Sequence, residues 1–188
     1  RQSEPSVAPD GSRLVFTWTA DQTAGLGIGR IDGSNLRWLT RNPADCCAKW
    51  SPDGRRIAFG RKVAPGQRDV ILIPPDGGAE RVIARMEGNH LAWGNNDPSV
   101  LAIVRRTHPE EPLSVFLVDT TTGGQRRLTW PPRGDWGDIA AAAVSVLPAW
   151  VVARYASPGD GKLIMLGGRR ILPLNSEGAW VTGPVASA

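Results

Sequence analysis

Two adjacent cysteines carry the most evident chemistry in this chain of 188 residues. Cys46 and Cys47 are its only cysteines. Because neighbouring residues do not easily reach ordinary disulfide geometry, the pattern favours two small apolar side chains that enter a strand. The alternatives are a vicinal redox pair or a site for a soft metal, although the C-x-x-C spacing of the usual redox and metal motifs is absent.

The other reactive groups are not spaced as a catalytic site. Neither His90 nor His108 belongs to an H-E-x-x-H sequence, and the chain has no G-x-S-x-G sequence. The glycines at 25, 27 and 29 lie in an apolar run that no helical pattern follows, so they do not predict a phosphate-binding loop. We therefore expect no catalytic residue, no metal ligand, no cofactor and no enzyme activity.

Three aspartates belong to turn sequences, because each is followed directly by glycine. Aspartate supplies a side-chain acceptor and glycine tolerates a positive φ, and a tight turn needs both. The dense alternation of acidic residues that a calcium loop requires is absent. We interpret as structural turn residues Asp10, Gly11, Asp53, Gly54, Asp76 and Gly77.

The first two turns belong to a phrase that the chain repeats. Residues 8–16 (APDGSRLVF) are similar to residues 51–59 (SPDGRRIAF), 43 residues later. The same spacing separates Trp50 from Trp93. Self-similarity at about 40–50 residues indicates a propeller or a solenoid. Short apolar runs separated by turns give four short strands in each period, which is one propeller blade.

The sequence therefore predicts an all-β fold, a single β-propeller segment over residues 1–188 with about four four-stranded blades. The approximate blades are 4–44, 45–88, 89–138 and 139–180, and in the fourth the residues 143–145 stand where the Trp and Ser of the phrase are expected. Four units can close a small ring, close a ring in a dimer, or form an arc of a six- or seven-bladed ring. The arc is the interpretation we favour.

The phrase Trp-Ser-Pro-Asp-Gly-x-x-Ile-Ala-Phe at residues 50–59, with Leu-Thr at 39–40 and 128–129 at the ends of units, resembles the repeat of TolB-type β-propellers. The resemblance covers roughly residues 4–180 and is strongest over the first two units. Residues 128–138 also resemble a linker of bacterial proteins that fuse such a propeller to a winged-helix DNA-binding domain. The resemblance implies a non-catalytic sensor or interaction propeller of a bacterial regulatory or Tol-like periplasmic protein. The alternative that it implies is the gating propeller of a prolyl-oligopeptidase-like serine peptidase.

In such a propeller, the loops from the outer strand of one blade to the inner strand of the next gather around the channel. These loops supply the predicted binding residues, which are Arg41, Asp45, Asn89, His90, Trp130, Arg133, Asp135 and Trp136. Exposed tryptophan with arginine is typical of contact hot spots, so the third loop is the strongest candidate for binding a protein partner or a small ligand. Alternatively, Trp130 and Trp136 pack between blades.

The charge and hydropathy patterns exclude other classes of partner. The net charge of +4 comes from arginines in short, scattered pairs, which do not predict direct binding of nucleic acid. No apolar stretch approaches the roughly 18 residues of a membrane-spanning helix, so we expect membrane contact only through attached domains. The expected location is the periplasm or another extracytoplasmic compartment.

Overall fold

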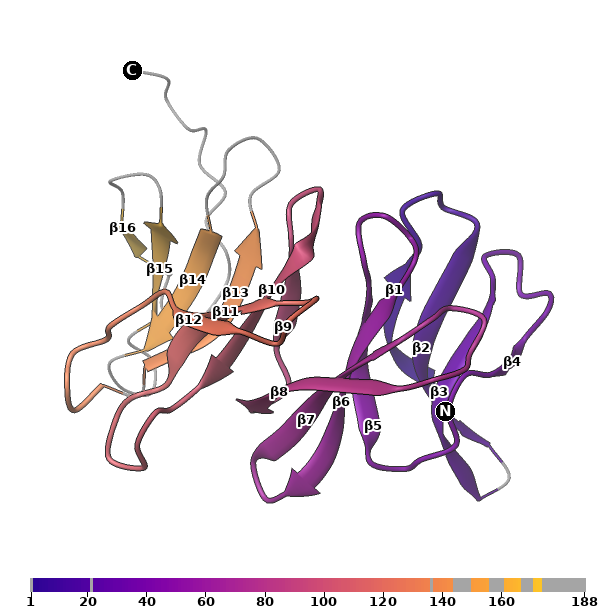
Figure 1. Ribbon diagram of the computed structural model, residues 1–188, viewed down its shortest axis with the longest axis horizontal. Helices are drawn as coiled ribbons and strands as arrows, with labels where there is room; N and C mark the ends of the chain where they lie inside the picture. Colours follow the sequence, from indigo (N-terminus) through magenta and orange to yellow (C-terminus); the bar gives the residue numbers. More distant parts are fainter. Residues whose placement is uncertain are drawn as a thin grey trace.

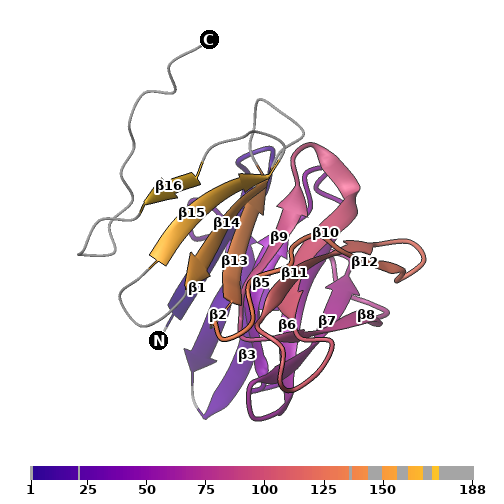
Figure 2. The same ribbon diagram turned by 90° about the vertical axis from the view of Figure 1, so that its left-hand side faces the viewer.

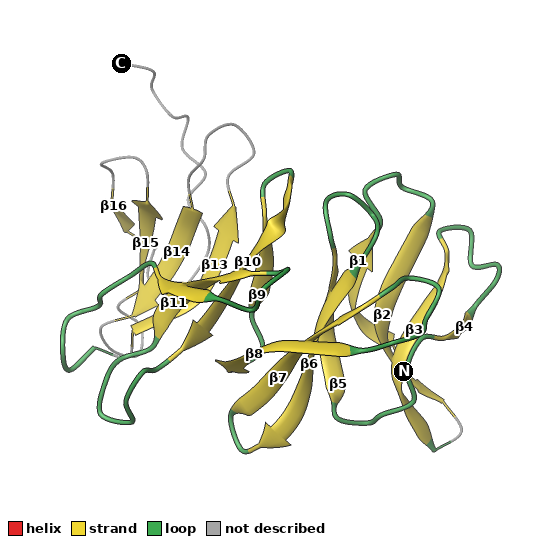
Figure 3. Cartoon of the chain, in the orientation of Figure 1, coloured by secondary structure: helices red, strands yellow, loops and turns green. Residues whose placement is uncertain are grey.

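A computed structural model of the chain describes residues 2–20, 22–135, 137–143, 150–155, 161–166 and 171–173. Every regular element in these residues is a β-strand, as Figure 3 shows. The strands of the described residues form four antiparallel sheets of four strands each. The prediction of an all-β fold is therefore confirmed. The described residues contain no helix with the length and apolar character needed to cross a membrane.

Each sheet takes four strands that are consecutive in the chain. The first sheet comprises β1 (Gln2–Val7), β2 (Arg13–Ala20), β3 (Thr23–Arg30) and β4 (Arg37–Trp38). The second comprises β5 (Asp45–Trp50), β6 (Ile57–Ala64), β7 (Gln67–Ile73) and β8 (Arg81–Glu87). The third comprises β9 (Leu91–Gly94), β10 (Asp97–Arg105), β11 (Ser114–Asp119) and β12 (Gln125–Arg127). The fourth comprises β13 (Gly137–Ala143), β14 (Trp150–Tyr155), β15 (Gly161–Leu166) and β16 (Ile171–Pro173).

The sheets follow one another in an arc, with the first and fourth at its two ends (Figure 1). Figure 2 looks along this arc from the fourth sheet toward the first. The first strands of neighbouring sheets contact each other, β1 with β5, β5 with β9 and β9 with β13. These strands therefore form the inner edge that the described sheets share.

The apolar core lies between the sheets, because each central strand alternates its side chains between two neighbours. In β6, Ile57 and Phe59 join the cluster that faces the first sheet, where Val15 and Ile28 are buried. Ala58 lies between them in sequence and joins the cluster that faces the third sheet. The central strands of the second sheet are thus covered on both faces.

Local hydrogen bonds close the repeated turns. The Asp10 carboxylate accepts bonds from the Ser12 amide at 2.9 Å and the Ser12 hydroxyl at 2.7 Å. The backbone bond from Ser12, followed by its hydroxyl bond, lowers the pKa of Asp10. The Asp53 carboxylate accepts a bond from the Ser51 hydroxyl at 2.6 Å. Gly54 follows with a φ of 69°, a conformation that glycine adopts at little cost.

Arginines near these turns hold each sheet to the next one. At the first joint, between the first and second sheets, Arg13 Nη1 lies 3.1 Å from Asp76 Oδ1. Arg37 Nη2 donates to the Pro75 carbonyl at 2.8 Å and lies 3.7 Å from Asp76 Oδ1. The carboxylate of Asp76, which the sequence assigned to its own turn, therefore pairs with arginines of the neighbouring sheet.

The second joint, between the second and third sheets, repeats this arrangement with different acceptors. Arg56 donates to the Pro98 carbonyl at 2.8 Å and to the Thr120 hydroxyl at 3.2 Å. Arg81 donates to the Thr120 carbonyl and, at 3.0 Å, to the carbonyl of Thr121. Thr120 is fully buried, and the bonds from Arg56 are partly buried, whereas the bond from Arg81 to the Thr121 carbonyl is exposed.

The fourth inner strand, β13, begins at Gly137 and ends at Ala143. Its register pairs Ala141 with Val152 and Ala143 with Trp150 of β14. Ala143 thus pairs with the first residue of the second strand, as Trp50 of the phrase pairs with Ile57 in the second sheet. This unit lacks the Trp-Ser-Pro-Asp-Gly marker, so no local motif indicates where its inner strand starts. Residues 144 and 145 lie outside the described residues.

Candidate functional site

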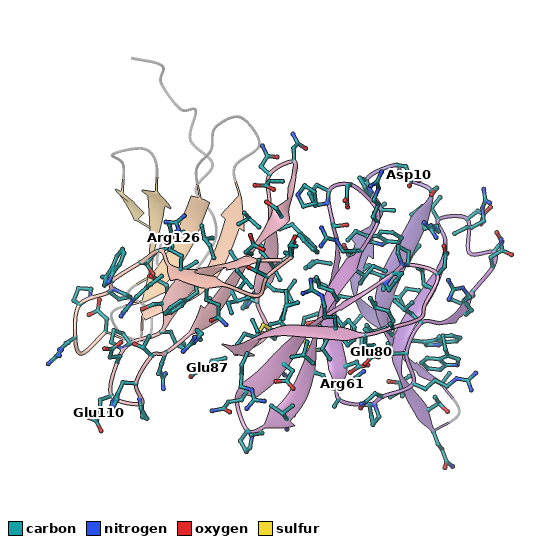
Figure 4. All side chains as sticks on the ribbon, in the orientation of Figure 1. Asp10, Arg61, Glu80, Glu87, Glu110 and Arg126 are labelled. Atoms are coloured by element: carbon teal, nitrogen blue, oxygen red, sulfur yellow. A yellow bond between two sulfur atoms is a disulfide. The ribbon has the colours of Figure 1, made fainter. Side chains whose placement is uncertain are left out.

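The predicted binding residues lie on the connections at the strand ends opposite the repeated turns. This loop face comprises the sheet-to-sheet connections 39–44, 88–90 and 128–136 and the hairpin loop 106–113. Figure 4 shows Asp10 of the first turn and Glu110 of the hairpin loop at opposite sides of the arc. The chain therefore offers two distinct ends, one of turns and one of longer loops.

Most predicted residues on the loop face are open to solvent. Exposed side chains belong to Arg41, Asn89, His90, Trp130 and Arg133. Asp135 is half-buried, and Trp136 lies outside the described residues. These exposures leave the side chains available for contact with a partner.

Asp45 differs from the other predicted residues because it is buried under an arginine. Arg61 Nε donates to Asp45 Oδ1 at 2.6 Å, and Arg61 Nη2 donates to Asp45 Oδ2 at 3.0 Å. The same guanidinium lies 2.6 Å from Glu80 Oε2, and Figure 4 shows the two side chains together. The hydrogen bonds that Arg61 donates, to Asp45 first and then to Glu80, raise the pKa of Arg61. The Asp45 carboxylate has no solvent exposure, so its role is to anchor β5 to β6.

A cleft of about 330 Å³ opens on the loop face between the hairpin loop and the third connection. It is lined by Arg106, Glu110, Glu111, Pro112, Leu113, Gly134 and Asp135. Sequence reasoning selected only Asp135 of these residues. The Glu110-Glu111 pair was the available signal, but nothing in the sequence placed this hairpin loop beside the third connection. Three carboxylates and one guanidinium make the lining acidic.

Arg127 joins this cleft to Trp130. Its Nη1 donates to Glu111 Oε2 at 3.1 Å, and its Nε donates to the Thr129 carbonyl at 2.8 Å. Its guanidinium carbon lies 5.9 Å from the centroid of the Trp130 ring. Trp130 is nevertheless 68% exposed, so the alternative in which this ring packs between sheets is wrong. The Thr107 hydroxyl, followed by the charge of Arg127, lowers the pKa of Glu111.

A second cleft, of about 340 Å³, lies at the first joint on the turn side. Arg13, Arg30 and Arg37 line it together with Asp76, and Ser12 and Asn35 add polar groups. Its arginines already hold the joint, since Arg13 and Arg37 both approach Asp76. We therefore assign this cleft to the packing of the sheets.

Cys46 and Cys47 are joined by a disulfide, so the expectation of two unpaired small residues is wrong. In a regular strand, consecutive side chains point to opposite faces. The pairing of β5 with β6 is irregular between Cys46 and Lys49, and Cys47 has a φ of 62°. This irregular backbone brings the two sulfur atoms to one side, and the sequence carries no marker for it.

The fold matches proteins of known structure. No protein-family model matches the chain. It is 28% identical over 128 residues to a TolB homolog of Chlorobium luteolum, an alignment that covers 65% of this chain and 27% of that protein. The crystal structure of TolB from Acinetobacter baumannii superposes with a TM-score of 0.75 at 12% identity, over 93% of this chain and 43% of that one. The chain has a TolB-type β-propeller fold.

The predicted resemblance to TolB-type propellers is thereby confirmed, whereas the resemblance of residues 128–138 to a winged-helix linker stays a prediction.

The chain is also similar to a prolyl endopeptidase of known structure. That superposition has a TM-score of 0.66 at 15% identity and covers 92% of this chain and 29% of the peptidase. The chain thus spans less than half the length of each of these three proteins.

Proposed function

We propose that this chain is a non-catalytic part of a binding propeller whose loop face contacts a protein partner. One observation carries the proposal: Trp130 is 68% exposed and is held through Arg127 beside an acidic cleft. Tryptophan and arginine dominate the binding energy of many protein interfaces. An exposed tryptophan on a fixed support loses little conformational freedom on binding, which favours affinity.

The charge of the cleft indicates which partner fits it. Glu110, Glu111 and Asp135 outnumber the one lining arginine, Arg106. Because opposite charges across an interface speed association and exclude wrong partners, we infer a partner segment with lysine or arginine side chains. The face of the Trp130 ring would contact an apolar or cationic side chain of the same segment.

The same proposal includes an extracytoplasmic sensor or interaction role within a larger ring. The Cys46–Cys47 disulfide supports this location, since disulfides persist in oxidising compartments. Similarity to TolB over less than half of the TolB chain supports the larger ring. The separate positions of the first and fourth sheets in Figure 1 agree with an arc.

Selection of peptides from a random displayed library tests the binding role. We expect enrichment of peptides with basic and apolar residues, and we expect Trp130→Ala to weaken their binding by about tenfold or more, as for a hot-spot residue. Ile31→Ala is the matched control, because Ile31 is another exposed large apolar residue, 57% accessible, outside the loop face. No enrichment, or equal losses in the two variants, would contradict the proposal.

The alternative is a gating propeller of a serine peptidase, which the similarity to the prolyl endopeptidase favours. In that case an α/β-hydrolase domain would belong to the same protein, and the loop face would admit peptides to it. The longer protein containing this chain would then hydrolyse proline-containing chromogenic peptides. Hydrolysis that the serine-directed inhibitor diisopropyl fluorophosphate stops would favour this alternative over the interaction role.

A further inference from the structure

We propose that Glu4, Cys46 and Cys47 bind a thiophilic divalent cation, such as Zn²⁺ or Cd²⁺, once the disulfide is reduced. This inference concerns the inner strands β1 and β5 and does not depend on the proposed role of the loop face. Reduction would turn a covalent link into two sulfur ligands, so the redox state of the pair controls the site.

The three ligand atoms are already gathered. One atom from each residue, a carboxylate oxygen of Glu4 and the two Sγ atoms, lies within 4.8 Å of the other two. Zinc binds sulfur at about 2.3 Å and carboxylate oxygen at about 2.0–2.2 Å, so tetrahedral ligands lie roughly 3.5–4 Å apart. Reduction frees the two bonded sulfur atoms to move apart to this spacing, while the Glu4 carboxylate already lies close to it.

A backbone hydrogen bond holds the carboxylate beside the cysteines. The Cys47 amide donates to Glu4 Oε2 at 3.1 Å, which links β5 to β1. Both residues have a positive φ, 55° at Glu4 and 62° at Cys47, and they lie 43 residues apart at the same place in the repeat. The irregularities of the two neighbouring inner strands therefore face each other.

Arg68 supplies a positive charge beside the sulfur atoms, which favours the two reduced cysteines as thiolate ligands. Its Nε donates to Cys46 Sγ at 3.3 Å, and its Nη1 donates to the Gly88 carbonyl at 2.6 Å, which fixes the guanidinium. A guanidinium at this distance offsets part of the negative charge of a thiolate ligand. Two thiolates and Glu4 carry three negative charges, so Arg68 and one divalent cation bring the site to neutrality.

The chemistry consists of reduction followed by binding. A dithiol reductant attacks one sulfur as a thiolate, breaks the Cys46–Cys47 bond and forms a mixed disulfide. Its second thiol then closes its own disulfide and releases the remaining cysteine, so two electrons and two protons pass to the chain. Cation binding displaces the two thiol protons into solvent. An oxidant that re-forms the disulfide expels the cation.

Cadmium titration of the chain tests the site, because thiolate-to-cadmium charge transfer gives an ultraviolet band that carboxylate or imidazole ligands do not. We expect the chain reduced with a phosphine and kept anaerobic to take up one ion with this band, and the oxidised chain to show none. Glu4→Gln keeps an acceptor for the Cys47 amide. It should weaken binding by at least about tenfold, the smallest loss usual even for an outer-shell partner of a metal.

Two variants serve as controls. Glu110→Gln removes a carboxylate that is exposed on the hairpin loop, and His90→Ala removes an exposed imidazole, so both should bind as the unsubstituted chain does. Circular dichroism establishes that each variant is folded. The proposal is overturned if the reduced chain shows no charge-transfer band, or if folded Glu4→Gln binds as tightly as Glu110→Gln.

Discussion

The first and second joints are built from the same repeated residues, yet they expose their contacts to water very differently. Arg13 lies 5.0 Å from the ring centroid of Trp50 at the first joint, and Arg56 lies 5.7 Å from that of Trp93 at the second. The partner of Arg13 is Asp76, whose side chain is 86% exposed. The partners of Arg56 are the partly buried Pro98 carbonyl and Thr120 hydroxyl, so one repeat produces a solvated ion pair at the first joint and a partly buried hydrogen-bonded contact at the second.

The two copies of the repeat therefore have similar backbone geometry, but their arginine contacts differ in how much they stabilise the fold. Exposed ion pairs contribute about 0–1 kcal/mol because water and salt screen them. Hydrogen bonds from a charged donor contribute about 1.5–3 kcal/mol. We therefore expect the second joint to contribute more stability than the first, although the two look alike in the sequence.

Removal of each arginine is the strongest test of this comparison. We expect Arg56→Ala to lower the free energy of unfolding by about 1.5–3 kcal/mol, because the bonds from its guanidinium to the Pro98 carbonyl and the Thr120 hydroxyl are lost, although the Thr120 hydroxyl still donates to the Pro98 carbonyl. Arg13→Ala should cost less than about 1 kcal/mol. Urea unfolding followed by circular dichroism measures both. Equal losses, or a larger loss for Arg13→Ala, would contradict the comparison.

The glycine of each repeated turn sharpens the comparison. Gly11 and Gly54 both have positive φ, but a Cβ at Gly54 would lie 3.4 Å from Pro9 of the first sheet, whereas a Cβ at Gly11 would meet nothing. Gly54→Val should cost about 1–3 kcal/mol from backbone strain, and Gly11→Val somewhat less. Arg133→Ala, on the exposed third connection, should leave the melting temperature nearly unchanged. Equal shifts for Gly54→Val and Arg133→Ala would refute this assignment of Gly54.

The two tryptophans of the joints give a smaller contrast. Trp93 Nε1 donates to the Lys49 carbonyl at 3.0 Å, whereas the buried Trp50 Nε1 has no hydrogen-bond partner within the described part of the chain. Trp93→Phe should therefore cost about 1 kcal/mol more than Trp50→Phe, since only the former breaks a bond. Differential scanning calorimetry of the two variants measures the difference. A larger loss for Trp50→Phe would count against it.

The smallest expected effect is a pH dependence of stability that arises from Asp119, in the turn that Arg81 contacts. Asp119 accepts bonds from the amides of Thr122 at 2.7 Å and Thr121 at 2.8 Å, and these bonds, that from Thr122 first, lower its pKa from 3.8. The folded state therefore favours the ionised form. Its contribution is complete above the unfolded pKa and is lost as the pH falls through the lower folded pKa.

Asp119→Asn should therefore be less stable than the unsubstituted chain at neutral pH, and this gap should narrow as the pH falls below about 4. Melting temperatures measured at several pH values between neutral and acidic conditions test this expectation. A gap that stays constant with pH would show that the ionised carboxylate has no special role in the turn.

The sequence predicted the fold well because its markers are local. The Trp-Ser-Pro-Asp-Gly phrase combines a turn with strands of alternating burial, and its spacing of 43 residues sets the repeat. The start of the fourth inner strand was not predicted, because its alanines from 140 to 143 carry no such marker. Where the phrase is absent, short apolar runs do not determine where a strand starts.

The candidate site was less predictable because it depends on contacts between distant segments. Asp45 looked like a loop residue, yet the register of β5 and β6 places it opposite Arg61 and buries it. The hairpin loop 106–113 meets the third connection only through the packing of the third and fourth sheets. The Cys46–Cys47 disulfide occurs with a positive φ at Cys47, and no local sequence motif predicts that backbone conformation.

The arginine side chains on the turn side of the joints also give the array a direction. On that side of both joints the arginine donors belong to the earlier sheet and the acceptors to the later one, whereas on the loop side Arg106 of the third sheet approaches Glu87 of the second. Deleting the first sheet would leave the second without cationic partners for Asp76, a carboxylate that water already solvates. Deleting the third sheet would leave the guanidinium groups of Arg56 and Arg81 on the second sheet without these hydrogen-bond acceptors. Truncation from the amino-terminal side should therefore be tolerated better than truncation from the carboxy-terminal side.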